Sequence, residues 1–328
     1  MKGIAFVPRK GSMIWGLFFL LLIGVMPGHG GNRTPIRMGY LQADLHQLPG
    51  LIAVEKKLYE KQGLNVTVAG AFKAGPEEMS AFAANELDFG FVGVAPAAVS
   101  VANHTAEVKV IAQVNNEGSA IVVRKDLPIQ TLKDLRERVV AIPGHATVQD
   151  VLLRKALLKE GLNINELKVI VLKPPEMLGA MRTKQIDGYI AWEPFVSMAV
   201  MEGYGKSLLT SRDIWPGHPC CVLVVQKEFL SESRETIKKI LKAHVEAIRW
   251  MKDRREETID IAMKFTGIDK ETVRRALGFI EYAYEPNVEG VMEYLRFLNE
   301  LRYVRIEDGK RFLAGFVDGT LLKEIHSR

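Results

Sequence analysis

Four short loops of the sequence combine small residues with the start of a helix, and this combination is suited to binding an anion. Helix starts carry unpaired backbone donors and partial positive charge. Gly75 and Gly93 allow the backbone to approach a ligand closely, and Thr147 suits the N-cap position. Any one loop could be an ordinary turn, so their repetition is what predicts a binding cleft. The loops are Lys73–Pro76, Val92–Pro96, Pro143–Thr147 and Trp192–Pro194.

Several polar or aromatic side chains stand at predicted strand ends beside these loops, where open parallel sheets bind ligands. His46 and Gln47 follow the first strand and can donate hydrogen bonds, with a solvated loop as the alternative. Trp192 could form one wall of a pocket. Glu193 suits an ammonium group or else caps its own helix. The remaining candidates are Asn115, which could form a turn instead, and His145, which could be merely exposed.

Signals for catalysis or for a cofactor are weak. Gly205-Lys-Ser207 is similar to the end of a phosphate-binding loop, but Val200 stands where that motif requires glycine. The sequence contains no nucleophile elbow. His218 with Cys220 and Cys221 matches no common zinc spacing. We therefore expect no catalytic residue, no metal and no cofactor.

Cys220 and Cys221 are adjacent and are the only cysteines. Neighbouring Cα atoms lie about 3.8 Å apart, below the usual disulfide window. Two packed thiols on a strand are therefore favoured over a strained bond between neighbours, and the pair is no disulfide framework.

The elements that must position these residues follow an alternating pattern. Strand-like and helix-like segments alternate over residues 36–114 and again over 138–202, which indicates mostly parallel sheets flanked by helices. Leu48–Gln62 reads as one amphipathic helix. The apolar segments Gly118–Lys125 and Cys220–Gln226 read as crossings between the two halves, and the pattern after Ser231 is helical.

This pattern predicts an α/β fold of two lobes that are joined by two crossings and can close on a ligand. The first lobe would comprise residues 31–124 and 220–328, including a helical C-terminal tail, and the second would comprise residues 125–219.

The N-terminus has the composition of an export signal. In the predicted signal peptide, residues 1–30, Lys2, Arg9 and Lys10 precede the apolar run Met13–Val25, which is shorter than the roughly 20 residues of a membrane span. An uncleaved anchor is the alternative. Removing the three basic residues lowers the formal net charge from +5 to +2, which argues against a nucleic-acid partner.

Six segments, in their order along the chain, carry a resemblance to a known family. They are Gly39-Tyr40, Ala74–Pro76, Leu87–Gly90, Gly93–Pro96, Gly118–Asp126 and Asp187–Pro194. Over residues 35–230 the chain resembles substrate-binding proteins of the nitrate/sulfonate/taurine class of ABC importers.

The resemblance implies a type II periplasmic binding fold, and a non-enzymatic periplasmic protein that delivers a small molecule to a membrane permease and its ATPase. We expect a monomer. By position, the resemblance points to ligand contacts at His46, Gly75, Gly93, Thr147 and Trp192.

The ligand class stays open among several compounds. Members of the class bind nitrate, bicarbonate, sulfonates, taurine, thiamine-precursor pyrimidines or riboflavin-like molecules, and a small anion or zwitterion is our main expectation. The segment His218–Cys221 departs from the pattern of sulfonate binders. The alternatives are a binder of a heteroaromatic compound, an enzyme of thiamine-pyrimidine or menaquinone synthesis, and a ligand-sensing ectodomain.

Overall fold

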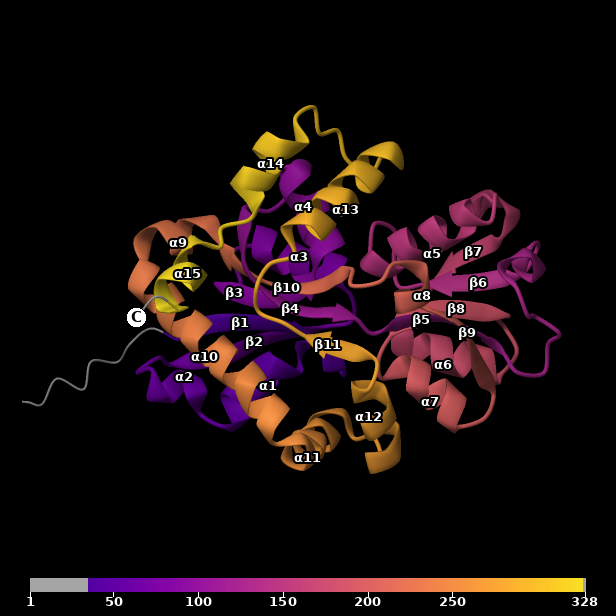
Figure 1. Cartoon of the computed structure of the whole chain (residues 1–328), viewed down its shortest axis with the longest axis horizontal. Coiled ribbons are helices and arrows are strands. Elements are labelled where there is room, and N and C mark those ends of the chain that lie inside the picture. The colour runs from indigo at the N-terminus through magenta and orange to yellow at the C-terminus, as the bar shows by residue number, and fades with distance from the viewer. Residues whose placement is uncertain (1–34, 327–328) are drawn as a thin grey trace, which may run out of the picture. The chain divides into compact units, whose positions relative to one another are not determined.

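The computed structural model describes residues 35–326, and the predicted signal peptide lies outside this range. The described residues form two sheets, of six and five strands, which Figure 1 shows side by side with helices around them. The predicted α/β class is thus confirmed. In this part of the chain, no helix combines the length and the apolar character needed to cross a bilayer.

Strands from both ends of the chain build the first sheet: β1 (Ile36–Leu41), β2 (Val66–Phe72), β3 (Phe89–Gly93), β4 (Val108–Glu117), β10 (Pro219–Gln226) and β11 (Ile280–Tyr282). Their order is β11-β4-β10-β3-β1-β2. β1 pairs in parallel with β2 and β3, whereas β10 lies antiparallel between β3 and β4. Every residue of β3 is buried, as expected of a strand covered on both faces.

The second sheet is built from the middle of the chain: β5 (Ser119–Arg124), β6 (Val139–Ile142), β7 (Lys168–Val171), β8 (Gly188–Trp192) and β9 (Gly205–Thr210). Their order is β7-β6-β8-β5-β9. β6 runs parallel to β7 and β8, and β5 runs antiparallel to β8 and β9. Each sheet therefore combines a parallel part with antiparallel strands at the crossings.

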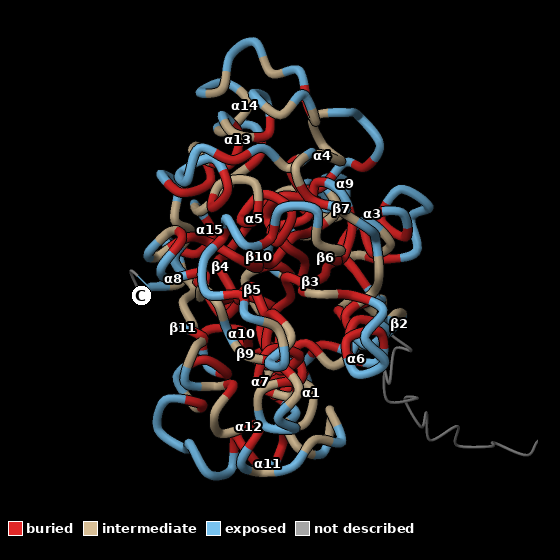
Figure 2. Tube along the Cα trace, turned by 90° about the vertical axis from the view of Figure 1, so that its right-hand side faces the viewer, coloured by how far each residue is buried: buried red, intermediate tan, exposed pale blue. Residues whose placement is uncertain are grey.

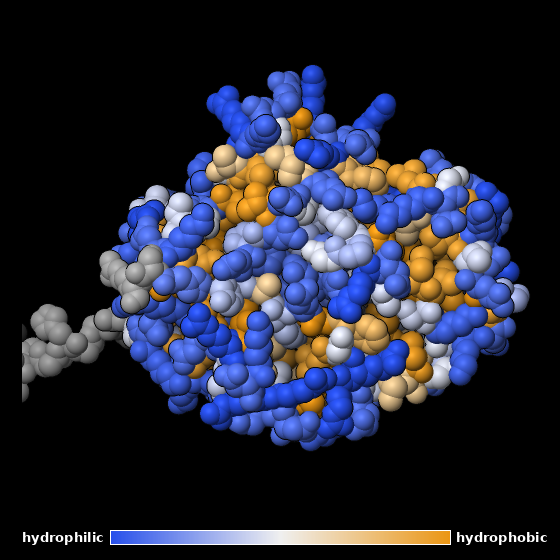
Figure 3. All heavy atoms as spheres, in the orientation of Figure 1, coloured by the Kyte–Doolittle hydropathy of each residue, from blue (hydrophilic) through white to orange (hydrophobic). Residues whose placement is uncertain are grey.

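Helices cover the faces of both sheets. Figure 2 shows that buried segments concentrate toward the centre of the molecule, whereas many of the outer loops are exposed. On the face drawn in Figure 3, polar side chains cover much of the surface and apolar ones gather in patches. The helices are α1 (Leu48–Glu55), α2 (Leu58–Lys61), α3 (Gly75–Ala83), α4 (Val94–Ala102), α5 (Val148–Lys159), α6 (Pro174–Arg182), α7 (Phe195–Met201), α8 (Ser211–Ile214), α9 (Lys227–Glu232), α10 (Arg234–Asp253), α11 (Arg255–Thr266), α12 (Lys270–Leu277), α13 (Val288–Glu300), α14 (Gly309–Phe316) and α15 (Thr320–His326), with short 3-10 turns η1 (Leu45–Gln47), η2 (Leu132–Leu135) and η3 (Ile164–Glu166).

The first passage between the sheets is a single glycine. Only Gly118 separates β4 from β5, and its φ of +84° is a conformation that favours glycine. A Cβ at this position would lie 2.3 Å from Nε2 of His46. The chain returns from β9 through α8 to β10. Gly118 therefore joins the sheets and also makes room for a buried side chain beside the junction.

Two local expectations were wrong. The helix predicted over Leu48–Gln62 is interrupted because Lys57 adopts a left-handed conformation, with φ 56°, between α1 and α2. The region after Ser231 is not purely helical, because β11 pairs with the end of β4. The segment Gly205–Thr210, for which a phosphate-binding loop was rejected on the sequence, forms an edge strand of the second sheet.

Candidate functional site

A small cavity lies between the two sheets and is lined from both sides. Its volume is about 20 Å³, on a scale where one water molecule needs about 10–15 Å³. The first-sheet side contributes Leu41, Asp44, His46, Gly75, Gly93, Pro96, Cys220 and Cys221, and the second-sheet side contributes Thr147, Val148, Gln149 and Trp192.

Strand ends and helix starts position this lining. β1, β3 and β8 end at the cavity, and α3, α4 and α5 begin beside it. Because the first amides of a helix have no partner within the helix, three positive helix ends are directed to one place. A Cβ at Gly93 would approach Cγ2 of Val148 to 3.2 Å, so the two sides nearly touch there. The predicted N-cap is confirmed, since Oγ1 of Thr147 accepts a hydrogen bond from the amide of Asp150.

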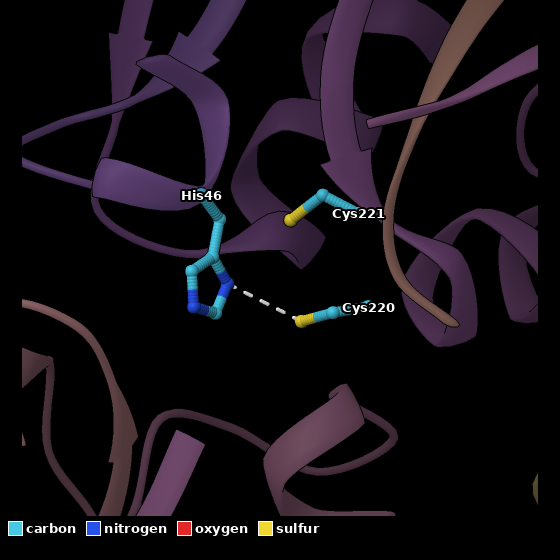
Figure 4. Close-up of side chains that lie close together, drawn as sticks. All are labelled: His46, Cys220 and Cys221. Carbon is cyan, nitrogen blue, oxygen red and sulfur yellow. Dashed lines mark hydrogen bonds between the residues drawn. The ribbon is translucent and has the colours of Figure 1, made fainter. Parts of the chain in front are cut away.

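His46 is fully buried and its ring is fixed on one side. Its Nε2 lies 2.8 Å from the carbonyl oxygen of Gly118. Because a carbonyl only accepts, Nε2 must donate, and the other nitrogen, Nδ1, faces Sγ of Cys220 at 3.3 Å (Figure 4). The backbone amide of His46 also donates to Oδ1 of Asp44 at 2.8 Å. The ring orientation is therefore set before any ligand arrives.

Both cysteines are free, buried thiols, and their sulfurs point toward the imidazole (Figure 4). Successive side chains of a regular strand alternate between faces. Here the register of β10 against β4 shifts on both sides of Cys221, and a bulge of this kind can redirect a side chain. Oδ1 of Asn115 accepts the amide of Cys221 at 3.1 Å and holds this irregular backbone. The two sulfurs therefore share one space.

The first-sheet wall carries charge. Burial raises the pKa of Asp44 to about 7. Burial lowers the pKa of His46, but the charges of Cys220 and Asp44 outweigh it and raise this pKa to about 9. Although burial opposes ionisation of Cys220, the hydrogen bond from Cys221 and the charge of His46 lower its pKa. The hydrogen bond to Cys220 and burial raise the pKa of Cys221. The wall thus favours one thiolate beside one imidazolium.

The second-sheet wall is neutral and offers one unused donor. Trp192 is 3% exposed, and its Nε1 has no hydrogen-bond partner among the described residues. The other polar groups on this wall are engaged, because Oγ1 of Thr147 donates to the carbonyl of Gly144 and Nε2 of Gln149 donates to Oγ of Ser119. A buried donor without a partner is costly, so a ligand acceptor at this position would be stabilised.

Comparison with known proteins now places the chain. A family model described as NMT1-like matches residues 29–266, well over half of the sequence. The chain belongs to the NMT1-like family.

Several proteins that are similar to this chain in sequence are named as binding proteins. A protein of Brucella abortus named "Putative binding protein" is 29% identical over 241 residues, which is 73% of this chain and 74% of the relative. A Bacillus subtilis protein named "Putative aliphatic sulfonates-binding protein" is 26% identical and covers 96% of each chain. The periplasmic nitrate-binding protein NrtA of Synechocystis superposes with a TM-score of 0.81 at 19% identity, over 90% of this chain and 88% of that one. The predicted periplasmic-binding-protein fold is confirmed by this likeness.

The structure brings five of the predicted site residues of this NMT1-like protein to one cavity and places the other four elsewhere. His46, Gly75, Gly93, Thr147 and Trp192 line it.

Gln47 is buried behind the wall, where its Oε1 accepts the amide of Leu41 at 2.6 Å. Asn115 holds the backbone of Cys221. The oxygens of Glu193 accept hydrogen bonds from the amide and hydroxyl of Ser197, which is the capping role given as the alternative. His145 is exposed and is not part of the lining.

Sequence reasoning missed Asp44, Gln149 and the two cysteines as lining residues. Asp44 follows the same strand as His46, so the rule that selected His46 could have found it. Proximity in the sequence groups the cysteines with His218, but the ring of His218 is directed to Tyr294, with 3.2 Å between Nδ1 and the hydroxyl. No local signal links the cysteines to His46, which lies 174 residues from Cys220.

Proposed function

We propose that this protein is the solute-binding subunit of an ATP-driven importer and holds a small anion or zwitterion in the cavity without changing it. One lobe would comprise residues 31–124 and 220–328, apart from β5 (Ser119–Arg124), which pairs within the second sheet, and the other would comprise residues 125–219. The two would close on the ligand. A cleaved signal peptide would deliver the monomer to the periplasm, where it would pass its ligand to a membrane permease and its ATPase. The names of the relatives support this role, since they include sulfonate- and nitrate-binding proteins.

The observation that carries the proposal is the convergence of donors on one cavity. Three helix starts, from both sides, begin at the cavity, and Trp192, whose Nε1 has no hydrogen-bond partner among the described residues, lines it. Such groups complement the oxygens of nitrate, bicarbonate or a sulfonate.

Calorimetric titration with nitrate, bicarbonate, taurine and ethanesulfonate tests this function. We expect one of them to bind with roughly micromolar affinity, which corresponds to about 8 kcal/mol. Trp192→Phe should weaken that ligand roughly 10- to 100-fold, because it removes a hydrogen bond to a charged group but keeps an aromatic wall.

Trp250→Phe is the matched control. Trp250 lies on α10, where the ammonium group of Lys56 is placed over its ring, and it does not line the cavity. It should bind like the wild type. The proposal fails if none of the four compounds binds, either to the metal-free protein or to protein supplied with Zn²⁺. Zinc is included because an imidazole and two thiols line the cavity. Equal affinity of Trp192→Phe and the wild type would remove Trp192 from the site.

A further inference from the structure

Three metal-binding atoms meet at the wall of the cavity. Nδ1 of His46 and the Sγ atoms of Cys220 and Cys221 all lie within 4.8 Å of one another, and all three residues are buried. The pair Nδ1 and Sγ of Cys220 is 3.3 Å apart. In a tetrahedral zinc site, bonds of about 2.0–2.1 Å to nitrogen and 2.3 Å to sulfur put nitrogen and sulfur about 3.6 Å apart and two sulfurs about 3.8 Å apart. Small side-chain adjustments would therefore reach zinc geometry.

The orientation of the imidazole is the one that a metal site requires. Histidine ligands usually donate the second ring N–H to a carbonyl or carboxylate, which fixes the tautomer. Nε2 of His46 does this with the carbonyl of Gly118 at 2.8 Å, which leaves Nδ1 as the atom that faces the sulfurs. Asp44 also lines the cavity, and its Oδ1 is 3.9 Å from Nδ1.

The sulfurs are also held in place. The bulged register of β10 turns both Cys220 and Cys221 toward His46, and Asn115 holds the backbone amide of Cys221. Two adjacent residues of a regular strand would not converge in this way. The alignment therefore depends on long-range contacts and is not a property of the Cys-Cys pair alone.

We propose that His46, Cys220 and Cys221 form a binding site for a thiophilic divalent cation of the zinc type. One imidazole and two thiolates select zinc-like ions over magnesium or calcium, which prefer oxygen ligands. The ion displaces to solvent whatever protons remain on the three ligand atoms, and no oxidation state changes. Two thiolates balance its charge.

The fourth coordination position opens on the cavity, because all three ligands line it. Three protein ligands with an open position is the arrangement that leaves zinc free to take an exogenous oxygen. In the second part of the proposal, which rests on the proposed function, an oxygen of the bound anion fills this position. The cation would then add positive charge to the wall that faces the anion.

The metal is tested first, without any anion. Protein stripped with a chelator and kept reduced is titrated with Zn²⁺ in competition with a chromophoric chelator, and with Co²⁺ as a spectroscopic probe. We expect one equivalent of each, with the thiolate-to-cobalt absorption that only sulfur ligands produce. Cys220→Ser, Cys221→Ser and His46→Gln should each weaken zinc binding by more than the roughly 10- to 100-fold typical for losing an outer partner of a ligand.

Two comparisons make this test decisive. His145→Gln removes an exposed histidine that lies outside the lining, and it should bind zinc like the wild type. Asp44→Asn, which removes a carboxylate 3.9 Å from Nδ1 of His46 but no ligand atom of the proposed site, should weaken zinc less than the three ligand variants do. Wild-type protein that takes up no Zn²⁺, or a cobalt spectrum without thiolate absorption, overturns the site even if a ligand variant fails to fold. Unchanged affinity in the three ligand variants does the same.

Nitrate, bicarbonate, taurine and ethanesulfonate are then titrated into metal-free and into zinc-loaded protein. Binding that requires zinc supports the second part, and equal binding in both forms overturns it. If zinc binds at the three residues but no small anion binds in either form, the metal site stands and the proposed transport function fails. The two failures are therefore distinguishable.

Discussion

Two buried histidines make the same hydrogen bond but have pKa values shifted in opposite directions. One lies at the cavity, and the other lies on the buried side of α10. His46 and His244 are both fully buried, and each donates Nε2–H to a backbone carbonyl at 2.8 Å. They differ in what faces the other ring nitrogen. Nδ1 of His46 faces Cys220, whereas Nδ1 of His244 has no hydrogen-bond partner in the described part of the chain.

The pKa values follow from this difference. Burial lowers the pKa of His244 to about 4, although the hydrogen bond to the carbonyl of Gln113 acts in the opposite direction. Phe91 packs against the ring, with ring centroids 5.8 Å apart. At His46 the charges of Cys220 and Asp44 outweigh burial and raise the pKa to about 9. Burial of a histidine therefore gives a neutral core residue unless neighbours supply charge, and only the cavity supplies it.

Blocking the cavity should have the largest effect on ligand binding. In Gly93→Trp the side chain must enter the space where a Cβ already meets Val148 at 3.2 Å and Pro96 at 3.3 Å. We expect ligand binding to be lost in calorimetric titration, because the added side chain occupies the cavity.

Gly179→Trp is the matched control. Gly179 lies exposed in α6, and a Cβ added there would meet no atom within 4 Å, so this change should not affect binding. If Gly93→Trp binds the ligand like Gly179→Trp, the cavity is not the binding site.

Disturbing the contact between His46 and the carbonyl of Gly118 should have a smaller effect than blocking the cavity. It should nevertheless lower the free energy of unfolding by more than backbone strain alone. In Gly118→Ala, alanine must adopt the positive φ of this position, which is unfavourable for a residue with a Cβ. That Cβ would also lie 2.3 Å from Nε2 of His46. We expect a loss of roughly 2–4 kcal/mol in the free energy of unfolding by chemical denaturation, from strain and a displaced hydrogen bond.

Gly267→Ala isolates the strain, because Gly267 has φ +71° but no atom near a Cβ. It should lose only roughly 1–2 kcal/mol. Equal losses in the two variants would show that His46 is not held by the space at Gly118.

The core histidine should reveal itself by pH dependence. The folded pKa of His244 is about 4, below the unfolded value of 6.5, so the unfolded chain takes up this proton first as the pH falls. Stability is therefore lost between pH 6.5 and 4. From pH 7 to pH 4.5 we expect the wild type to lose roughly 2–3 kcal/mol more than His244→Gln in denaturant titrations.

Replacement of the exposed His145 by Gln should leave the wild-type pH profile unchanged. Parallel profiles for the wild type and His244→Gln would contradict the assignment of His244 as a neutral core residue and would remove the contrast with His46.

Local chemistry made a large part of the fold and of the site predictable. The helix starts at Gly75 and Val148 follow from glycine, proline and N-cap residues within a few positions, and their strand-end location follows from the alternating pattern. This is enough to select Gly75, Gly93 and Thr147, which do line the cavity. Prediction from the sequence failed where the conformation of one residue interrupts a helix, as at Lys57. It also failed where a short strand pairs with a strand far away in the sequence, as β11 does with β4.

The sequence by itself determined the α/β class, the strand-end loops and the family resemblance, because these depend on residue periodicity and on turns that neighbouring residues specify. Only the tertiary structure decided that His46 meets two cysteines 174 and 175 positions away, that Glu193 caps its own helix, and that Trp192 keeps an unused donor. The physical reason is that β10 enters the first sheet antiparallel and bulged. Its pairing partners and the direction of its side chains are fixed by contacts with β3, β4 and Asn115, and no local pattern contains them.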